Sequence, residues 1–353
     1  MQQKWMIYGA NGYTGALIAR NAVAQGLRPI LAGRRHEEIY SLANELGLES
    51  RVFSLVEFKQ VVIGLSDIDL VLHCAGPFSA TSAPMIEGCL AVGAHYLDIT
   101  GEIGVFEHLH APEQATRAVE AGVVLCSGVG FDVIPTDCVA LKLKELLPHA
   151  THLSLGFDSD SGISPGTLKT MMQGLASSSA ERRDGIITEV QLGKKSRTID
   201  FGRGAKTAMA IPWGDVSTAF HTTGIPNIDT WIPMPTYKII GVRSLKWLRP
   251  LLATSTIQQA LRKWVNHSVK GPDGIARKNS PAYLWGEART ANGETCTVRI
   301  QTANVYNLTV FGSLAVVSRL IDMNVSGGSY TPAMLFGAEL IEELPESGKF
   351  QIT

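Results

Sequence analysis

The sequence has few cysteines and almost no net charge. None of the cysteines forms a C-x-x-C pair, and the closely spaced histidines have no cysteine or third histidine beside them. This pattern argues against a disulfide framework and predicts no metal site. Cys74, Cys89, Cys126 and Cys138 lie in apolar surroundings, where cysteine usually acts as a small buried hydrophobe. The formal net charge of −1 offers no positive surface to a polyanion, so we expect no nucleic-acid partner.

Signals for targeting and for membrane insertion are also missing. The first apolar run begins at Trp5, which leaves little room for a signal or transit peptide, so we predict a cytoplasmic chain. An apolar stretch at residues 305–323 contains Asn307, Ser313 and Arg319. These polar side chains predict a buried helix of a soluble domain, so we expect no transmembrane segment.

What is present is an alternation of short apolar runs with helical patterns. With 353 residues, of which 45% are hydrophobic, the chain can form about two domains with a large core. This alternation predicts an α/β fold of Rossmann type, with a doubly wound parallel sheet. The predicted strands are 5–8, 28–33, 52–55, 69–74, 95–99 and 123–126, and the helices between them are 16–23, 36–46, 82–92 and 106–121.

The first strand runs directly into a glycine-rich turn with the spacing G-x-x-G-x-x-G. A side chain at Gly9 or Gly12 would hold a pyrophosphate away from the amides of the helix start, which attract the anion together with the helix dipole. Such glycines can also form only a turn, but the strand before them and the helix after them favour a nucleotide site. The predicted cofactor contacts in this turn are Gly9, Asn11, Gly12, Tyr13, Thr14 and Gly15.

The second strand is followed by two arginines, Arg34 and Arg35. An NAD-preferring site usually carries an aspartate or glutamate at this point for the ribose hydroxyls. A guanidinium is a planar and permanently charged donor that suits phosphate oxygens, so this pair predicts NADP. Either arginine alone could instead be a solvated side chain at the start of the next helix.

Small or polar residues follow each of the later strands. Ala75, Gly76 and Pro77 come after the fourth strand, Glu102 after the fifth and Asp132 after the sixth. Ligands of open α/β sheets bind outside the carboxyl ends of the strands. We therefore expect these turns to line one crevice, where the small residues let the ribose and nicotinamide lie against the backbone.

The middle of the chain, residues 136–325, predicts a second domain of mixed α/β type. A helix is expected at residues 165–177. The pair Asn292-Gly293 predicts a type I′ hairpin turn between strands at 284–290 and 295–302, and so an antiparallel sheet.

Two helical segments in the second half have open interpretations. Residues 244–269 form a basic amphipathic stretch, which can pack on its own protein or lie on a membrane surface, so peripheral membrane contact stays open. The sequence from Pro332 to residue 344 predicts a final helix.

Several motifs together resemble the saccharopine dehydrogenase-like family of NADP-binding oxidoreductases, particularly its trans-acting enoyl reductases. The resemblance implies that the chain returns to its first domain, so that residues 1–135 plus 326–353 bind NADP and residues 136–325 form an inserted substrate or dimerisation domain. It also implies that Arg34 contacts the adenosine phosphate and that Ala75-Gly76-Pro77 lies near the nicotinamide ribose. The motifs are Tyr8-Gly-Ala-Asn-Gly-Tyr-Thr-Gly15, Ala32-Gly-Arg34, Ala75-Gly-Pro-Phe78, Tyr96-Leu-Asp-Ile-Thr-Gly-Glu102, Gly130-Phe-Asp-Val-Ile-Pro-Thr-Asp137 and Gly327-Gly-Ser-Tyr-Thr-Pro-Ala333.

Hydride transfer also needs a group that gives or takes a proton. No tyrosine has a lysine four residues later, which excludes the usual Tyr-x-x-x-Lys arrangement. Glu102 and Asp132 are the predicted catalytic residues, with Asp137, Tyr96 and His73 less favoured. Glu102 could instead bind backbone amides, and Asp132 or Asp137 could cap the next helix.

The sequence therefore predicts an NADP(H)-dependent oxidoreductase that reduces a C=C or C=N bond in a small-molecule or lipidic substrate. Two alternatives from other classes are a redox sensor that binds NADP(H) without turnover and a lipid-surface protein anchored by residues 244–269. A homodimer is compatible with the sequence.

Overall fold

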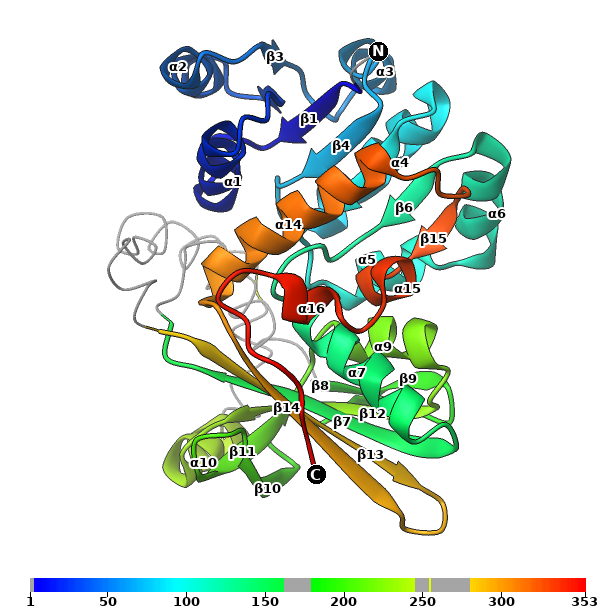
Figure 1. Cartoon of the computed structure of the whole chain (residues 1–353). Coiled ribbons are helices and arrows are strands. Elements are labelled where there is room, and N and C mark those ends of the chain that lie inside the picture. Colours follow the sequence, from blue (N-terminus) through cyan, green and yellow to red (C-terminus); the bar gives the residue numbers. More distant parts are fainter. Residues whose placement is uncertain (1–2, 162–178, 245–253, 255–279) are drawn as a thin grey trace. The chain divides into compact units, whose positions relative to one another are not determined.

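The structure is a computed structural model that describes residues 3–161, 179–244, 254 and 280–353 (Figure 1). It divides the chain into two compact units. Unit 1 comprises Met1–Ile134 and Tyr306–Phe336, and unit 2 comprises Pro135–Val305 and Gly337–Thr353. The predicted helix at 165–177 and nearly all of the amphipathic stretch 244–269 lie outside the described residues.

Unit 1 contains a seven-stranded sheet in which every neighbouring pair is parallel. The strand order is β3-β2-β1-β4-β5-β6-β15, so the direction of winding reverses between β1 and β4. This is the predicted doubly wound Rossmann-type sheet, which is confirmed. The strands are β1 Trp5–Tyr8, β2 Ile30–Gly33, β3 Ser50–Val52, β4 Leu70–His73, β5 His95–Asp98, β6 Val124–Cys126 and β15 Gly328–Tyr330.

Several helices of unit 1 differ from the prediction. The helix at Phe58–Gly64 was not predicted, and the helix predicted from residue 82 begins at Phe78. The predicted helix 106–121 is two helices, because Pro112 has no N–H to continue the first one and instead begins the second. The predicted helix from Pro332 to residue 344 ends at Phe336, where Gly337 has φ +81°. The helices are α1 Tyr13–Ala24, α2 His36–Leu46, α3 Phe58–Gly64, α4 Phe78–Val92, α5 Ile103–Leu109, α6 Pro112–Ala121, α14 Val305–Asp322 and α15 Pro332–Phe336.

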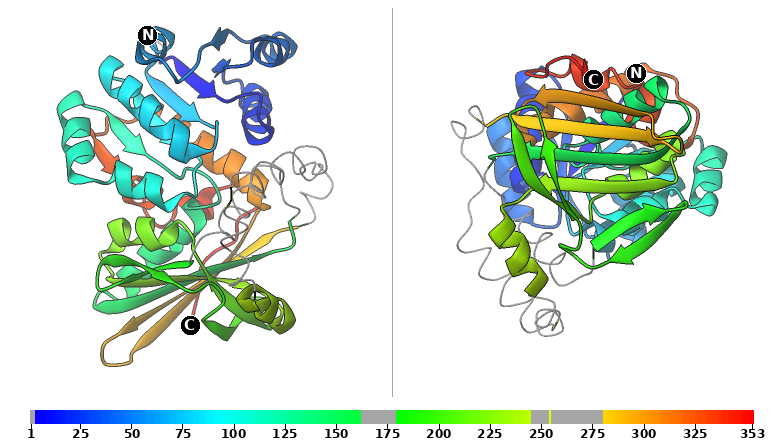
Figure 2. Two further views of the ribbon diagram at one scale, coloured as in Figure 1. Left: turned by 180° about the vertical axis from the view of Figure 1, so that it is seen from behind. Right: turned by 90° about the horizontal axis from the view of Figure 1, so that it is seen from below.

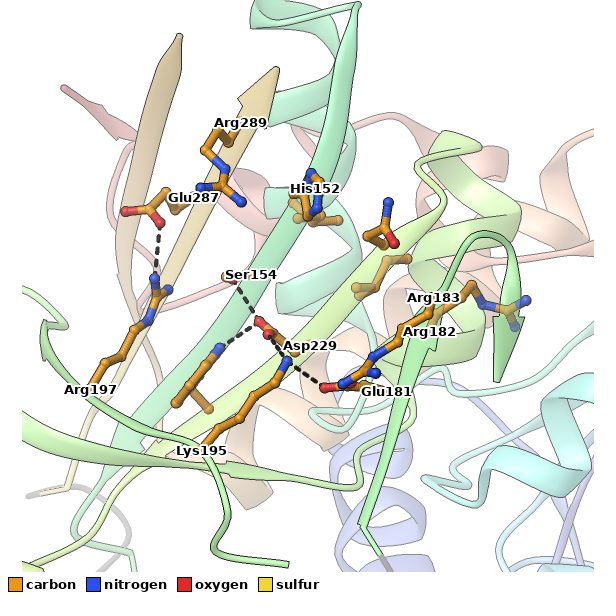
Figure 3. A pocket seen from close by; sticks show the side chains of 14 residues that line it. His152, Ser154, Glu181, Arg182, Arg183, Lys195, Arg197, Asp229, Glu287 and Arg289 are labelled. Carbon is orange, nitrogen blue, oxygen red and sulfur yellow. Dashed lines mark hydrogen bonds and ion pairs between the residues drawn. The ribbon is translucent and has the colours of Figure 1, made fainter. Parts of the chain in front are cut away.

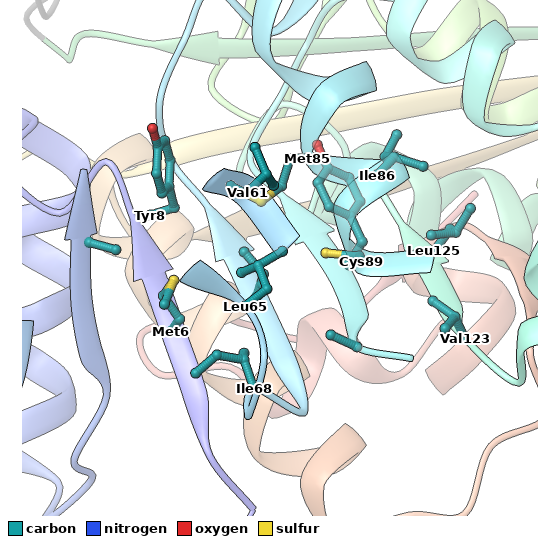
Figure 4. Close-up of a cluster of buried hydrophobic side chains, with 14 of the residues drawn as sticks. Met6, Tyr8, Val61, Leu65, Ile68, Met85, Ile86, Cys89, Val123 and Leu125 are labelled. Carbon is teal, nitrogen blue, oxygen red and sulfur yellow. The ribbon is translucent and has the colours of Figure 1, made fainter. Parts of the chain in front are cut away.

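One face of this sheet forms the core shown in Figure 4. Met6 and Tyr8 lie two residues apart on β1, so both point to the same side of the sheet. Helices α3 and α4 cover this side with apolar residues that include Val61 and Met85, both fully buried. Cys89 is buried in the same cluster, as expected for a cysteine that acts as a hydrophobe. Burial of each large apolar side chain contributes about 1.5–3 kcal/mol.

Unit 2 is built on a mixed sheet, as predicted for the second domain. The strand path is β10-β11-β12-β7-β13-β14-β16, with β8 and β9 attached beside β12. Only β7 and β12 pair in parallel among the described strands of this sheet. The strands are β7 Ala150–Ser159, β8 Ser179–Arg183, β9 Ile186–Val190, β10 Ser196–Asp200, β11 Ala205–Ile211, β12 Asn227–Pro233, β13 Ala282–Thr290, β14 Thr295–Thr302 and β16 Gln351–Ile352. The helices are α7 Ile134–Leu146, α9 Asp215–Thr223, α10 Thr236–Ser244 and α16 Leu340–Glu343.

The β13–β14 hairpin is confirmed, but its turn is not the predicted type I′. That turn needs a positive φ at both central residues. Gly293 has φ +90°, whereas Asp184 and Glu346 are the described non-glycine residues with positive φ, so Asn292 has none. Gly293 N donates to Thr290 O at 3.1 Å and Thr290 N donates to Glu294 O at 2.9 Å. The loop is therefore a three-residue connection with a left-handed glycine at its end.

The C-terminal boundaries of the units also differ from the predicted 326–353 and 136–325. Helix α14 belongs to unit 1, because Ser313 Oγ donates to Val129 O and Thr309 Oγ1 accepts from Phe131 N. The last residues belong to unit 2, where β16 extends the sheet beside β14. At the other boundary the units divide after Ile134, next to the predicted residue 135.

Helix α14 is long and apolar enough to cross a membrane by length and composition alone. Core helices of soluble proteins pass the same test, and 56% of α14 is buried in the chain. Within the parts of the chain that the structure describes, no other helix meets these criteria.

Candidate functional site

The glycine turn between β1 and α1 is tightly packed. Gly9 has φ +84°, and a Cβ built there would lie 2.8 Å from the Cβ of Ala75. A Cβ at Gly15 would lie 2.4 Å from Gly9 O. Because real Cβ atoms do not approach so closely, only glycine fits both positions. The turn thus comes directly against the segment that follows β4.

The start of α1 suits an anion. Gly12 occupies the N-cap position without a side-chain hydrogen bond, and the first turn carries no acidic residue. The N-terminus of a helix presents main-chain amides and the positive end of the helix dipole. Thr14 is half-buried, and the ring of Tyr13 packs edge-on at 5.2 Å from that of Tyr306 on α14. Tyr13 thus packs against α14, and its cofactor contact stays a prediction.

An acid stands beside the two arginines, which the sequence analysis missed. Arg35 Nη1 donates to Glu38 at 2.7 Å, and Asn11 Nδ2 donates to the other Glu38 oxygen at 2.5 Å. The bonds from Arg35 and Asn11 hold the pKa of Glu38 below its usual range. Arg34 is exposed and forms no ion pair within the described parts of the chain, so it keeps its charge available for a phosphate. The i,i+3 spacing of Arg35 and Glu38 on α2 could have indicated their pairing.

The turn after β4 lies next to the glycine turn. Thr81 Oγ1 donates to Ala75 O at 2.7 Å and so connects this turn, Ala75-Gly76-Pro77, to α4. His73 Nε2 lies 3.0 Å from Thr81 Oγ1. Because the Thr81 hydroxyl donates its hydrogen to a carbonyl, the imidazole donates to the hydroxyl oxygen. Burial lowers the pKa of His73 to about 3, so this ring is neutral and unsuited to proton exchange near pH 7.

Glu102 caps a helix. Its two carboxylate oxygens accept from Phe78 N and Ser79 N, each at 2.8 Å, at the start of α4. A carboxylate at this place satisfies amides that the helix leaves unbonded and complements the dipole. Both oxygens are therefore used by main-chain donors, which favours the structural alternative for Glu102.

Asp132 has the surroundings of a proton-exchanging group. A Cβ built on Gly101 would lie 2.7 Å from Asp132 Oδ2, so the carboxyl lies against the backbone of the turn after β5. Burial disfavours the charged carboxylate and raises the pKa of Asp132 to about 6. A carboxyl with a pKa near the working pH can both give and take a proton.

Asp98 connects the two strand ends that carry Glu102 and Asp132. Its buried carboxylate accepts from Tyr96 Oη at 2.7 Å, Ser127 Oγ at 2.9 Å, Gly128 N at 2.9 Å and Thr100 N at 3.0 Å. Burial raises the pKa of Asp98, although the four hydrogen bonds oppose the shift. The bonds use the Tyr96 hydroxyl as well, so this network is structural.

Asp137, the remaining candidate, belongs to unit 2. It is buried on α7 and accepts from Thr222 Oγ1 of α9 at 2.5 Å. This bond joins two helices of unit 2 and supports a structural role. Across the described residues, no group of three or more His, Cys, Asp or Glu side chains could hold a metal ion.

The comparisons with known proteins agree with the nucleotide site. Residues 5–126 match the saccharopine dehydrogenase NADP binding domain. A mouse saccharopine dehydrogenase-like oxidoreductase is 30% identical over 158 residues, which cover 39% of this chain and 37% of that protein. The trans-acting enoyl reductase of Mycobacterium bovis is 26% identical over an alignment of 409 positions. This alignment covers 97% of this chain and 96% of that protein. The matched domain confirms the predicted resemblance and the predicted NADP cofactor.

The likeness to solved structures concerns the fold. Apo saccharopine dehydrogenase (L-Glu forming) from Saccharomyces cerevisiae superposes with a TM-score of 0.66 at 11% sequence identity. The superposition covers 99% of this chain and 100% of the yeast chain. The likeness supports the fold class of this chain, a Rossmann-type sheet and a second mixed sheet.

Proposed function

We propose that this chain, whose residues 5–126 match a saccharopine dehydrogenase NADP binding domain, is an NADP-dependent oxidoreductase that reduces a C=C or C=N bond. The observation that carries the proposal is the turn from Gly9 to Gly15, in which Gly9 and Gly15 have no room for a side chain and which opens onto a helix N-terminus. The near full-length similarity to a trans-acting enoyl reductase supports C=C reduction as the first reaction to test.

The residues of unit 1 fit NADP. The glycine turn and the start of α1 would hold the pyrophosphate, and Arg34 would contact the adenosine phosphate. The small residues Ala75, Gly76 and Pro77 would lie along the nicotinamide ribose. When bound, the reduced cofactor supplies a hydride. The chain itself must bind and orient the reactants and handle the proton.

Asp132 is the proposed proton-exchanging residue. Its pKa of about 6 leaves both protonation states accessible near neutral pH. Glu102 is the weaker candidate, because Phe78 N and Ser79 N already engage its carboxylate. Asp132→Asn should lower kcat by about 100-fold or more while changing the NADPH affinity little. An equal loss for Glu102→Gln, with unchanged α4, would transfer the role to Glu102.

The test is calorimetric titration with NADPH and NADH, followed by stopped-flow oxidation of bound NADPH in the presence of enoyl and imine compounds. Tight NADPH binding with turnover of any compound supports the proposal and gives the substrate class. Tight binding without turnover would replace it by the redox-sensor alternative. Absence of binding by either nucleotide would overturn the nucleotide site as well.

A further inference from the structure

The sheet of unit 2 carries a pocket of about 410 Å³ that is separate from the residues discussed above. Figure 3 shows side chains from several strands converging on it. The register of the strands explains the convergence, because Ser154 of β7 lies opposite both Asp229 of β12 and Glu287 of β13. One step along the same face, His152 lies opposite Arg289.

Two carboxylates of the pocket, Glu181 and Asp229, are already paired with cations. Glu181 contacts Arg183 and lies 2.5 Å from Lys195 Nζ. Asp229 lies 3.2 Å from the same Lys195 and accepts from Ser154 Oγ at 2.6 Å. Burial opposes the charge of Lys195, but the hydrogen bond that Lys195 donates to Glu181 and the charges of Asp229 and Glu181 raise its pKa overall. These groups therefore hold one another and leave no carboxylate of the pair free.

Arg197 is fixed on two aromatic rings with one edge unused. Its guanidinium carbon lies 4.8 Å from the ring centre of Trp231 and 4.7 Å from that of Trp285. Nη1 donates to Glu287 at 3.0 Å. Nε and Nη2 are buried and have no hydrogen-bond partner among the described residues. These two nitrogens form the edge that binds a carboxylate or phosphate through parallel hydrogen bonds.

Arg289 adds a second available cation. Its side chain is exposed and has no ion-pair partner in the described residues, although it lines the pocket. The pocket is lined by five cationic side chains and three carboxylates. They are Arg182, Arg183, Lys195, Arg197 and Arg289 against Glu181, Asp229 and Glu287. The cations outnumber the carboxylates, so the lining carries a positive charge. Arg182 donates to the main-chain oxygens of Val216 and Gly185, which leaves Arg289 and the unused edge of Arg197 to meet an anion.

We propose that this pocket binds a small molecule that carries an oxyanion, either a carboxylate or a phosphate. The unused edge of Arg197 receives the anionic group. Arg289 adds a second positive charge beside His152, its partner on the neighbouring strand. Satisfying two buried N–H groups is favourable, because a buried donor without a partner is costly. The proposal does not depend on the nucleotide site of unit 1.

The test is calorimetric titration at low ionic strength, without nucleotide, using inorganic phosphate and succinate as separate probes. We expect saturable binding of at least one probe, and the better probe identifies the anion class. Arg197→Lys keeps the charge but loses the paired edge, and Arg289→Gln loses the charge, so each should weaken binding about tenfold. Glu287→Gln should instead strengthen binding severalfold, because it removes a competing carboxylate from Arg197.

The matched control is Arg299→Gln. Arg299 is on β14, where it lies opposite Trp285 of β13. It does not line the pocket, and it donates to Asp200 O. Its loss should change probe affinity less than twofold. No binding of either probe up to about 20 mM by the wild-type protein, an Arg299→Gln effect as large as that of Arg289→Gln, or weaker binding by a folded Glu287→Gln variant would each overturn the proposal.

Discussion

At Gly9, the backbone conformation and the space around it both exclude a side chain. The residue has φ +84°, and a Cβ would meet three atoms of Ala75 at 2.8–2.9 Å. Gly26 has a similar φ of +79° but nothing within 4 Å of its Cβ position. The two glycines therefore separate the cost of the conformation from the cost of the close approach.

Gly9→Ala should destabilise the protein by about 2–4 kcal/mol, since strain at positive φ adds to overpacking. Gly26→Ala should cost about 1 kcal/mol. Urea unfolding of both variants, with NADPH titration of the folded fraction, checks this. Similar losses of stability in the two variants would mean that the turn at Gly9 can rearrange to accommodate a side chain.

Glu38 brings negative charge next to the expected position of the 2′-phosphate. Glu38→Gln should raise the affinity for NADPH relative to NADH by about threefold to tenfold, because it releases Arg35 and removes a repelling charge. Arg34→Ala should act in the opposite direction and weaken NADPH more than NADH. Calorimetry with both nucleotides measures the ratio, and Glu37→Gln on the same helix turn is the control. An unchanged ratio in Glu38→Gln would contradict this assignment.

Asp132 should make stability depend on pH. Its pKa is about 6 in the folded protein against 3.8 for an ordinary aspartate, so the folded state binds more protons between these values. Stability should therefore fall as the pH rises from 4 to 6, by up to about 3 kcal/mol from this group. Asp132→Asn removes the titration, so its stability relative to wild type should be higher at pH 7 than at pH 4. The measurement is the unfolding free energy of wild type and Asp132→Asn from denaturation curves at both pH values. If the assignment is wrong, the difference between the two proteins is the same at pH 4 and pH 7.

Among the elements, α4 depends on a side chain from another strand end. Pro77 at its N-cap position provides no side-chain bond, and Glu102 caps Phe78 N and Ser79 N instead. The sequence could not distinguish this role from catalysis, because both require a carboxylate after β5. The deciding fact is the approach of two strand ends, which no local pattern contains.

Glu102→Ala should therefore loosen the first turn of α4. We expect a loss of about 1–2 kcal/mol and faster hydrogen exchange at the Phe78 and Ser79 amides. Glu102→Gln keeps one acceptor, so its stability and its exchange rates should lie between those of wild type and Glu102→Ala. If kcat falls while exchange at these amides stays at the wild-type rate, the catalytic interpretation is the better one.

Strand β15 shows which elements the sequence does not reveal. No strand was predicted for its segment, in which Gly327 and Gly328 precede Ser329. It becomes a strand through parallel pairing with β6, from Gly328 beside Val124 to Tyr330 beside Cys126. A Cβ on Gly327 would lie 2.4 Å from Ala118 O, so the glycine permits the approach. Apolar periodicity, by contrast, predicted the buried strands β1 and β4 within one residue at each end.

On the scale of the whole molecule, the nucleotide site was predictable and the pocket of unit 2 was not. The residues from Gly9 to Gly15 are contiguous, so a local motif contains their chemistry. Arg197, Arg289 and Glu287 come from separate strands and meet only through the strand register. Helix α14 likewise bonds to residues distant in the sequence, because the hydroxyls of Thr309 and Ser313 contact the main chain of Phe131 and Val129. Figure 2 shows the strands of unit 2 from two further sides.

The division of unit 1 into two separated segments bears on biosynthesis. During translation, Met1–Ile134 leaves the ribosome long before Tyr306–Phe336, with the strands of unit 2 made in between. The edge of β6 that later receives β15 is therefore exposed while the chain is growing. An unpaired strand edge invites association with other chains, so nascent molecules should need protection by a chaperone until the final segment emerges.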